Sequence, residues 1–365
     1  MSKLPDLKIG DLIINPPIIQ GGMGVRISLA NLASAVSNTG CVGTIASAII
    51  GGVKSKLGTQ SDTEASEYKS PDAQELFLQI RKAKALTMGI LAVNIMVATV
   101  SYEEVVKVAV DEGVNLIISG AGLPLNLPKY VIGSKTKIAP IVSSGRTTDI
   151  ICKTWIRKHN YVPDAIVVEG PLAGGHLGYS PDELEDKSKM PKLENLLAEV
   201  LAVTKKYEDI HNKKIPVIAA GGIYDGKDIA KFLKLGASGV QIATRFVCTH
   251  ECDASDKFKQ AFVDCKKEDI TIIHSPVGMP GRALKNEFLE KSKRGEIKFK
   301  CAWRCVKPCI PSKSPYCIAD ALINAANGNF DGGFVFAGAN AYRCNKIVSV
   351  KELVDELVSE AEANM

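Results

Sequence analysis

The decapeptide EGPLAGGHLG, at residues 169–178, contains one histidine and four glycines, and it lies directly after a stretch typical of a buried strand. Imidazole has an ordinary pKa of about 6.5, so His176 could take up or release a proton near neutral pH. Glycine destabilises ordered structure, and Gly174, Gly175 and Gly178 therefore indicate strained turns or a close approach of the backbone to a bulky ligand. A turn that merely contains a histidine is the alternative interpretation.

Two other glycine-rich segments have the composition of a phosphate-binding site. Each ends an apolar run: AAGGI contains Ala220, Gly221 and Gly222, and IATRF contains Ala243 and Thr244. Bare backbone N–H groups beside a helix N-terminus bind phosphate, and a threonine hydroxyl adds a donor. The arginine after Thr244 would add positive charge if it turned to the same side. Tight packing between strands and helices is the other reason for glycine here.

Amides and one carboxylate also lie in or at the ends of apolar runs. Gln20 and Asn94 each end such a run, Glu169 ends a third, and Gln241 lies inside a fourth, where its direction is undetermined. Buried amides need hydrogen-bond partners, and a flavin ring presents a matching edge of N–H and C=O groups. Amides that tie barrel loops to one another would give the same pattern.

The segment CAWRCVKPCIPSKSPYC contains four of the ten cysteines, Cys301, Cys305, Cys309 and Cys317. Three prolines make its second half a loop, which can wrap four thiolates around an iron–sulfur cluster or, second, a zinc ion. The spacing matches neither the C-x2-C knuckle nor the ferredoxin motif. Cysteines that pack as small buried hydrophobes are the alternative.

Composition excludes several classes of function. The net charge of +5 over 365 residues is small, and no basic block alternates with aromatics, so we expect no nucleic-acid partner. The N-terminus lacks an apolar signal core, and the longest apolar stretch, 89–100, is too short for a bilayer. We therefore expect a soluble cytoplasmic protein with no membrane partner and no disulfides. G-x-G-x-x-G, P-loop and H-E-x-x-H motifs are absent.

Eight short apolar, β-branched runs supply the elements that would position these residues. They are PPIIQ (16–20), CVGTIAS (41–47), ILAVNIMV (90–97), VNLIISG (114–120), IAPIVSS (138–144), AIVVEG (165–170), IPVIAAGG (215–222) and SGVQIATRF (238–246). Such runs are typical of parallel strands buried on both faces. Amphipathic segments alternate with them, at 29–38, 73–86, 103–112, 146–159, 192–208 and 227–235. This alternation predicts an α/β fold, a (β/α)8 TIM barrel, in which loops at the C-terminal strand ends carry the site.

The remaining chain predicts a second, smaller inserted domain. We expect the barrel to comprise 1–250 plus 332–365, with a long loop at 48–72 and a C-terminal helix that packs back on the barrel. Residues 251–331 would form the small domain: a helix over 253–267, an irregular stretch beginning IIHSPVG, a basic helix within 285–300 and the cysteine segment.

Seven motifs in order give the chain a family resemblance: PIIQGGMG, AVNIMVA, SGAGLP, VVEGPLAGGHLG, PVIAAGGI, GVQIATRF and GRALKN. Together they resemble the nitronate monooxygenase (2-nitropropane dioxygenase) family, which includes flavin-dependent enoyl-acyl-carrier-protein reductases and NAD(P)H:quinone reductases. The resemblance covers about 1–290 and 328–360 and implies an FMN-containing barrel with a small domain over the flavin. It implies His176 as the active-site histidine and the following FMN contacts: Gln20, Gly21, Gly22, Met23, Asn94, Gly174, Gly175, Gly221, Gly222, Ala243 and Thr244. We add Glu169, Ala220 and Gln241, which lie in or at the ends of the same strands.

Three functions remain open at this point. The first is oxidation of alkyl nitronates or nitroalkanes with FMN, in which neutral His176 takes a proton from a nitroalkane or protonated His176 pairs with a nitronate. The second is reduction of enoyl thioesters or quinones, with NAD(P)H as reductant. The third is a non-catalytic barrel that binds a phosphate ligand. The substrate is a small molecule in the first two, a homodimer is possible as the assembly, and the long loop and cysteine segment leave the substrate itself open.

Overall fold

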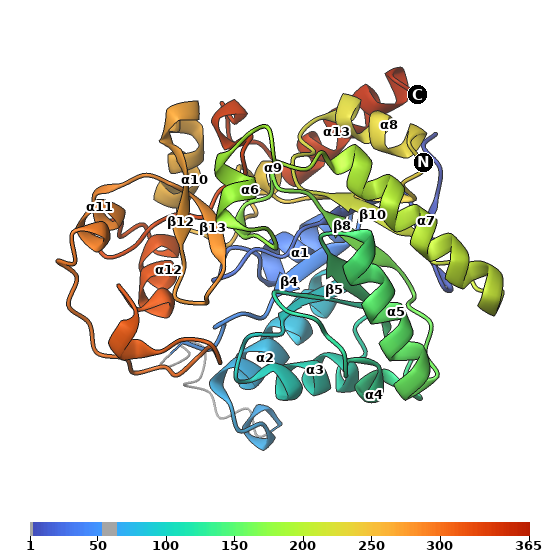
Figure 1. The fold of residues 1–365 in the computed structure, drawn as a ribbon, viewed down its shortest axis with the longest axis horizontal. Coiled ribbons are helices and arrows are strands. Elements are labelled where there is room, and N and C mark those ends of the chain that lie inside the picture. The colour runs from blue at the N-terminus through green and yellow to red at the C-terminus, as the bar shows by residue number, and fades with distance from the viewer. Residues whose placement is uncertain (1–2, 53–63) are drawn as a thin grey trace.

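The computed structural model describes residues 3–52 and 64–365, and its centre is a closed eight-stranded parallel barrel (Figure 1). The barrel strands are β3 (Ile18–Gln20), β4 (Gly43–Ala46), β5 (Leu91–Met96), β6 (Leu116–Gly120), β7 (Lys137–Val142), β8 (Ile166–Glu169), β10 (Val217–Ala220) and β11 (Gly239–Ile242). They pair in the order β3-β11-β10-β8-β7-β6-β5-β4, and a parallel bridge between Ile19 and Val42 joins the two ends. The predicted (β/α)8 barrel is confirmed.

Alternation along the strands separates two hydrophobic layers. In β8, Val167 packs inside the barrel, whereas Ile166 and Val168 pack outward in the large core shared with the helices. This is the period of two that a strand imposes on its side chains. A short hairpin, β1 (Leu7–Ile9) and β2 (Leu12–Ile14), contributes to the inner layer, and its Leu7 lies against the start of β11 at Gly239. The sequence interpretation had missed this hairpin.

The described residues form helices at all six predicted amphipathic segments and at several other positions. They are α1 (Ala30–Ser37), α2 (Pro71–Leu86), α3 (Tyr102–Asp111), α4 (Pro128–Val131), α5 (Gly145–His159), α6 (Pro181–Glu185), α7 (Leu193–His211), α8 (Gly226–Lys234), α9 (Thr244–Val247), α10 (Asp256–Asp264), α11 (Glu287–Lys293), α12 (Ile318–Ala326) and α13 (Val350–Ala363). The C-terminal α13 packs on α8, as predicted, and Glu360 accepts a hydrogen bond from the backbone N–H of Gly226 at 2.8 Å. Within the described residues, no helix is long and apolar enough to cross a bilayer.

A small antiparallel sheet lies beside the barrel mouth (Figure 1). It consists of β12 (Ile270–His274), β13 (Pro280–Leu284) and β9 (Gly175–His176). The expectation of an irregular stretch after residue 271 was wrong, because the prolines and glycines that suggested it lie in the turn and at the first residues of β13. The basic helix is also shorter than its basic segment, since α11 ends at Lys293.

A second hydrophobic cluster accompanies this sheet. Its members come mainly from the chain between Ile273 and Phe334, with Val25 and Ile49 added from the barrel loops. Helix α10 belongs instead to the large core through Phe258. The division into domains at 250/251 and 331/332 stays a prediction, and the central part of the expected loop 48–72, residues 53–63, lies outside the described residues.

Candidate active site

A cavity of about 260 Å³ lies at the carboxyl ends of the barrel strands and extends under the small sheet. It gathers residues from loops far apart in the sequence, as a TIM barrel does. The predicted site residues that line it are Gly21, Gly22, Met23, Asn94, Glu169, Gly174, Gly175, His176, Ala220, Gly221, Gly222, Gln241, Ala243 and Thr244. Of the residues predicted to contact the cofactor, Gln20 alone does not line it, and the four cysteines of the predicted metal site lie elsewhere.

Gln20 serves the barrel instead. Its side chain is fully buried, its amide oxygen accepts a hydrogen bond from the Thr44 N–H at 2.8 Å, and its amide nitrogen donates to the Gly21 carbonyl. Both ends of the amide are therefore occupied by loop backbone. The structure gives no support to direct contact with a cofactor, because the alternative, an amide that ties loops together, accounts for both bonds.

Gly174 and Gly175 of the histidine loop must be glycine for different physical reasons. A Cβ on Gly174 would lie 2.6 Å from the backbone nitrogen of Gly338, so this position packs backbone against backbone. Gly175 has φ of +74°, and a Cβ there would meet nothing within 4 Å. Gly175 is therefore required by its left-handed conformation, and it leaves open space beside the histidine.

His176 is held by the small sheet. As part of β9 it pairs with Gly281 of β13, and its Nε2 lies 2.7 Å from the Ser275 hydroxyl. The Phe336 ring meets the imidazole edge-on at 5.0 Å between centroids. Burial lowers the pKa of His176 to about 4, so the imidazole is neutral at neutral pH. The expected pairing of a protonated His176 with an anion is not favoured, and the neutral ring offers one donor and one acceptor.

Arg282 fixes the chain that leads to the histidine. Its guanidinium is 4% exposed and donates to the carbonyl oxygens of Pro171 and Ala173 at 2.5 and 2.6 Å. Burial without a carboxylate partner lowers the pKa of Arg282 to about 10, so the group remains charged. The sequence interpretation gave Arg282 no role, although it lies in the quoted motif GRALKN, because nothing local shows where a buried guanidinium points.

Glu169 and Gln241 face the cavity with unsatisfied polar atoms. Burial raises the pKa of Glu169 to about 7, and its carboxyl has no hydrogen-bond partner among the described residues. The Gln241 Oε1 is buried and also lacks a partner there. The two residues lie at one level of the barrel, since Ala220 of β10 pairs with both. Buried polar atoms are rarely left unpaired, so this level fits a ligand that supplies N–H donors.

Comparisons with known proteins agree with this geometry. The family model "Nitronate monooxygenase" matches residues 6–360. The chain belongs to the nitronate monooxygenase family. A probable nitronate monooxygenase of Staphylococcus saprophyticus is 27% identical, with 79% of this chain and 81% of that protein covered. A (3aS,4S,5R,7aS)-5-hydroxy-7a-methyl-1-oxo-octahydro-1H-indene-4-carboxyl-CoA dehydrogenase of Mycobacterium tuberculosis is 26% identical, with 95% and 93% covered. The solved structure of FabK from Thermotoga maritima has a TM-score of 0.72 and 26% identity, covering 96% of this chain and 94% of that one.

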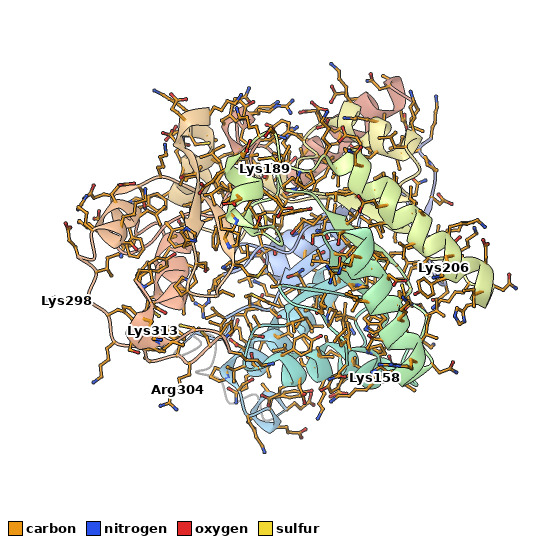
Figure 2. All side chains as sticks on the ribbon, viewed as in Figure 1. Lys158, Lys189, Lys206, Lys298, Arg304 and Lys313 are labelled. Atoms are coloured by element: carbon orange, nitrogen blue, oxygen red, sulfur yellow. The ribbon has the colours of Figure 1, made fainter. Side chains whose placement is uncertain are left out.

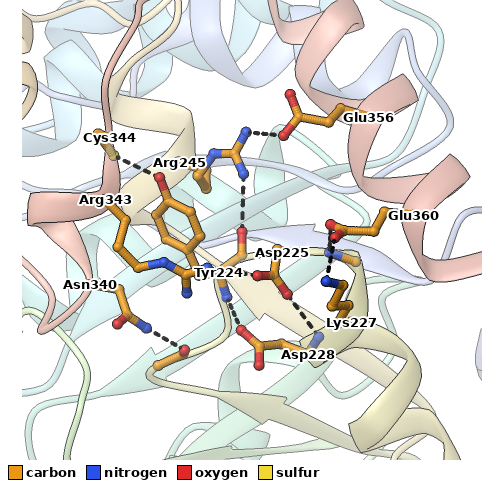
Figure 3. A network of polar contacts seen from close by, with 12 residues as sticks. Tyr224, Asp225, Lys227, Asp228, Arg245, Asn340, Arg343, Cys344, Glu356 and Glu360 are labelled. Atoms are coloured by element: carbon orange, nitrogen blue, oxygen red, sulfur yellow. Dashed lines mark hydrogen bonds and ion pairs between the residues drawn. The ribbon is translucent and has the colours of Figure 1, made fainter. Parts of the chain in front are cut away.

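Membership of the nitronate monooxygenase family confirms the recognised resemblance and the enzyme class, a flavin oxidoreductase. The glycine loop after β10 lines the cavity, and its conformation suits a flavin cofactor. Gly222 has φ of +101°, and a Cβ there would lie 3.0 Å from the Leu172 Cβ. Asn340 holds the same loop by donating to the Gly222 carbonyl at 2.7 Å (Figure 3).

Arg245 does not add charge to that loop. Its guanidinium donates to Glu356 at 2.8 Å and to the Tyr224 carbonyl at 3.3 Å, away from the cavity (Figure 3). The conditional expectation that Arg245 would supplement the site is therefore wrong. Within the described residues, no lysine or arginine lines the cavity at all. The cationic side chains labelled in Figure 2, such as Lys158 and Lys206, lie exposed on the outer surface.

The cysteine segment packs as part of the second hydrophobic cluster. Cys317 is buried in that cluster, and the partly buried Cys305 and Cys309 pack against it. Burial, with the neighbouring thiols adding to it, raises the pKa of Cys305 to about 12, which favours the protonated thiol over a metal-binding thiolate. Among the described residues, no group of three or more His, Cys, Asp or Glu side chains is arranged to hold a metal ion. The predicted metal centre is not confirmed.

Replacing Arg282 by methionine should destabilise the protein, because two buried carbonyls would lose their donor. An unsatisfied buried group costs roughly 1–3 kcal/mol, so we expect the free energy of unfolding to fall by an amount on that scale or larger. Urea unfolding followed by circular dichroism measures it. The control is Arg157→Met, on the exposed face of α5. Equal effects of the two substitutions would contradict the stabilising role of the Arg282 hydrogen bonds.

Ionisation of Glu169 should weaken the fold as pH rises. With a folded pKa of about 7 and an ordinary value of 4.5, the folded protein alone keeps the proton between these values, so stability is lost over that interval. Glu169→Gln should remove this loss, and at pH 8 it should be more stable than wild type by an amount on the order of 3 kcal/mol. Urea unfolding of flavin-free protein from pH 4.5 to 8.5 measures it. The exposed Glu185→Gln is the control, and a wild-type curve parallel to that of Glu169→Gln would refute the assignment.

Proposed function

We propose that this member of the nitronate monooxygenase family is an FMN-dependent enzyme that oxidises alkyl nitronates or nitroalkanes. The observation that carries the proposal is the neutral His176 in a cavity otherwise lined by glycine loops, amides and apolar side chains. A buried imidazole held at Nε2 by a serine is suited to acid–base work rather than to simple binding.

FMN fits the polar end of the cavity. The orphaned Gln241 Oε1 and the unpaired Glu169 carboxyl are partners for the N–H groups of an isoalloxazine edge. Gly21, Gly22, Met23 and Asn94 would lie along the ring, with Gly174 and Gly175 on its other side, and Gly221, Gly222, Ala243 and Thr244 would hold the phosphate. When bound, FMN supplies the electron acceptor.

The chain's own residues would bind and orient the substrate. The small sheet holds His176 at the cavity wall, 2.7 Å from the Ser275 hydroxyl. We assign the ring proton to Nε2, which then donates to the Ser275 oxygen and leaves Nδ1 to accept a substrate proton. The Val277 N–H also donates to the Ser275 hydroxyl, at 3.3 Å, which fixes the serine in turn. A base positioned in this way can accept the acidic proton of a nitroalkane carbon.

The apolar end of the cavity supports a substrate with an alkyl chain. Val277, Val306, Ile318, Leu322 and Phe336 line it. A carboxylate remote from the reacting carbon would find no lysine or arginine among the described lining residues, and it would meet the Glu169 carboxyl. We therefore propose that simple alkyl nitronates bind better than nitronates with a second negative charge.

The second candidate is an NAD(P)H-dependent reductase of enoyl thioesters or quinones. It is favoured by the similarity to FabK and to a carboxyl-CoA dehydrogenase, and the same apolar end would accommodate an acyl chain. A non-catalytic barrel that binds a phosphate ligand would not explain why a neutral histidine is fixed from two sides. The cysteine segment is not part of the proposal, since its thiols pack in the second cluster.

Gly222→Val should reduce flavin content. A side chain at φ of +101° is strained, and at 3.0 Å from Leu172 it would displace the loop that we assign to the phosphate. We expect FMN per chain to fall at least tenfold, measured by absorbance after release from purified protein. Gly133→Val is the matched control, because Gly133 also has positive φ but nothing within 4 Å. Full flavin occupancy in Gly222→Val would contradict the assignment of this loop to the phosphate.

Anaerobic mixing of the purified yellow protein with propyl-2-nitronate, NADH or NADPH tests the function. We expect rapid bleaching of the flavin by the nitronate. Bleaching by a pyridine nucleotide, with none by nitronate, would replace the proposal with the reductase.

His176→Asn should retain FMN but lose turnover of the neutral nitroalkane by about 10²–10⁴-fold, the usual scale for a general base. An unchanged rate in that variant would leave the histidine a purely architectural role.

A further inference from the structure

A second, smaller cavity of about 230 Å³ lies beside the segments that follow β10 and β11. Its lining includes Tyr224, Arg245, Cys248, Arg343, Cys344 and Lys346. The proposed oxidation of nitronates uses none of them. Figure 3 shows that Arg245, Arg343 and Cys344 converge on the Tyr224 side chain.

Two cysteines meet in this cavity. Cys248 and Cys344 are 3% and 4% exposed, and the chain segments that carry them run side by side. The Val348 N–H donates to the Cys248 carbonyl at 3.2 Å, and a parallel bridge joins Thr249 to Val348. Both thiols line the cavity, and each shifts the pKa of the other. The backbone contacts of Val348 hold the two segments together on one side of the cysteines.

The surroundings of Cys344 favour a thiolate. The Tyr224 hydroxyl donates to the Cys344 sulfur at 3.7 Å. The guanidinium carbons of Arg343 and Arg245 lie 4.0 and 4.8 Å from the Tyr224 ring centroid. The hydrogen bond from Cys248, the tyrosine and the two arginines together lower the pKa of Cys344 despite its burial.

The other buried cysteines provide the contrast. Burial raises the pKa of Cys41 and of Cys152 to about 12, and neither lines the second cavity. The hydrogen bond to Cys344, with burial, raises the pKa of Cys248. The two thiols also differ in their surroundings, because the Tyr224 hydroxyl lies against the Cys344 sulfur and Arg343 lies over the Tyr224 ring. Cys344 is therefore the candidate attacking thiol and Cys248 the candidate resolving thiol.

We propose that Cys344 is a reactive thiol that reduces hydrogen peroxide and that Cys248 then closes a disulfide with it. The Cys344 thiolate attacks one peroxide oxygen and the O–O bond breaks, which leaves a sulfenic acid, while the departing hydroxide takes a proton to form water. The Cys248 sulfur attacks the sulfenic sulfur, and a second water leaves as the disulfide forms. Two thiols and one peroxide thus give one disulfide and two waters.

The position of the pair indicates what its oxidation would affect. Cys248 directly follows α9, which begins at Thr244, and Cys344 follows the segment in which Asn340 holds the Gly222 carbonyl. A disulfide would covalently join the two segments that brace the glycine loop after β10. The inference itself does not depend on which substrate the large cavity takes.

The test uses the purified full chain with its thiols reduced. One equivalent of hydrogen peroxide should remove two of the ten thiols, and a non-reducing digest should contain the Cys248–Cys344 peptide. Cys248→Ser should lose one thiol and give a Cys344 adduct with dimedone, and Cys344→Ser should lose none. Cys152→Ser is the control and should behave as wild type.

Site-resolved alkylation of wild type keeps the proposal testable even if a variant does not fold. We expect Cys344 to be oxidised at least tenfold faster than Cys41 or Cys152 in the same sample. Equal rates at the three sites, or a cross-linked peptide with a different cysteine, would overturn the proposal.

Discussion

The pairing of β9 with β13 is the contact on which the arrangement of the cavity depends. A histidine at the end of a glycine-rich loop has no fixed position of its own. Two residues of pairing with Gly281 and Arg282, and two short hydrogen bonds from the Arg282 guanidinium, turn that loop into an edge strand. The barrel supplies the glycines and amides at one end of the cavity, and the small sheet holds the one titratable base against them.

Polar groups in this cavity are tuned by burial rather than by charge pairs. His176 is held neutral and Glu169 keeps its proton up to about pH 7 because each is removed from water without an opposite charge beside it. The only buried cation nearby, within the described residues, is Arg282, and its donors are directed at backbone carbonyls. A cavity of this kind discriminates by hydrogen bonding and shape, and its apolar end disfavours a substrate that brings a second charge.

Much of this could be predicted from the sequence, because the barrel strands are buried on both faces and so appear as uninterrupted apolar runs. Their order also placed most of the cavity residues at one end of the barrel. The sequence could not show the partners of Gln20, because an amide at a strand end can bond either a ligand or neighbouring backbone. Its bonds to the backbone of Thr44 and Gly21 appear only in the structure. The small sheet was missed because its strands are short, and because β13 begins with proline and glycine and pairs with a two-residue strand about a hundred positions away. Spacing alone could not show that Cys305, Cys309 and Cys317 pack with apolar side chains.

The two ends of the cavity come from different parts of the chain. Most of the glycine and amide end is built from barrel loops before residue 245, whereas much of the apolar end comes from residues between Val277 and Phe336. Substitutions among the apolar residues of the later segment can therefore change the shape of that end without touching the barrel loops. Exchange of residues 277–336 between relatives, with Gly281 and Arg282 kept for their contacts with the histidine loop, would transfer substrate selectivity as one block of sequence.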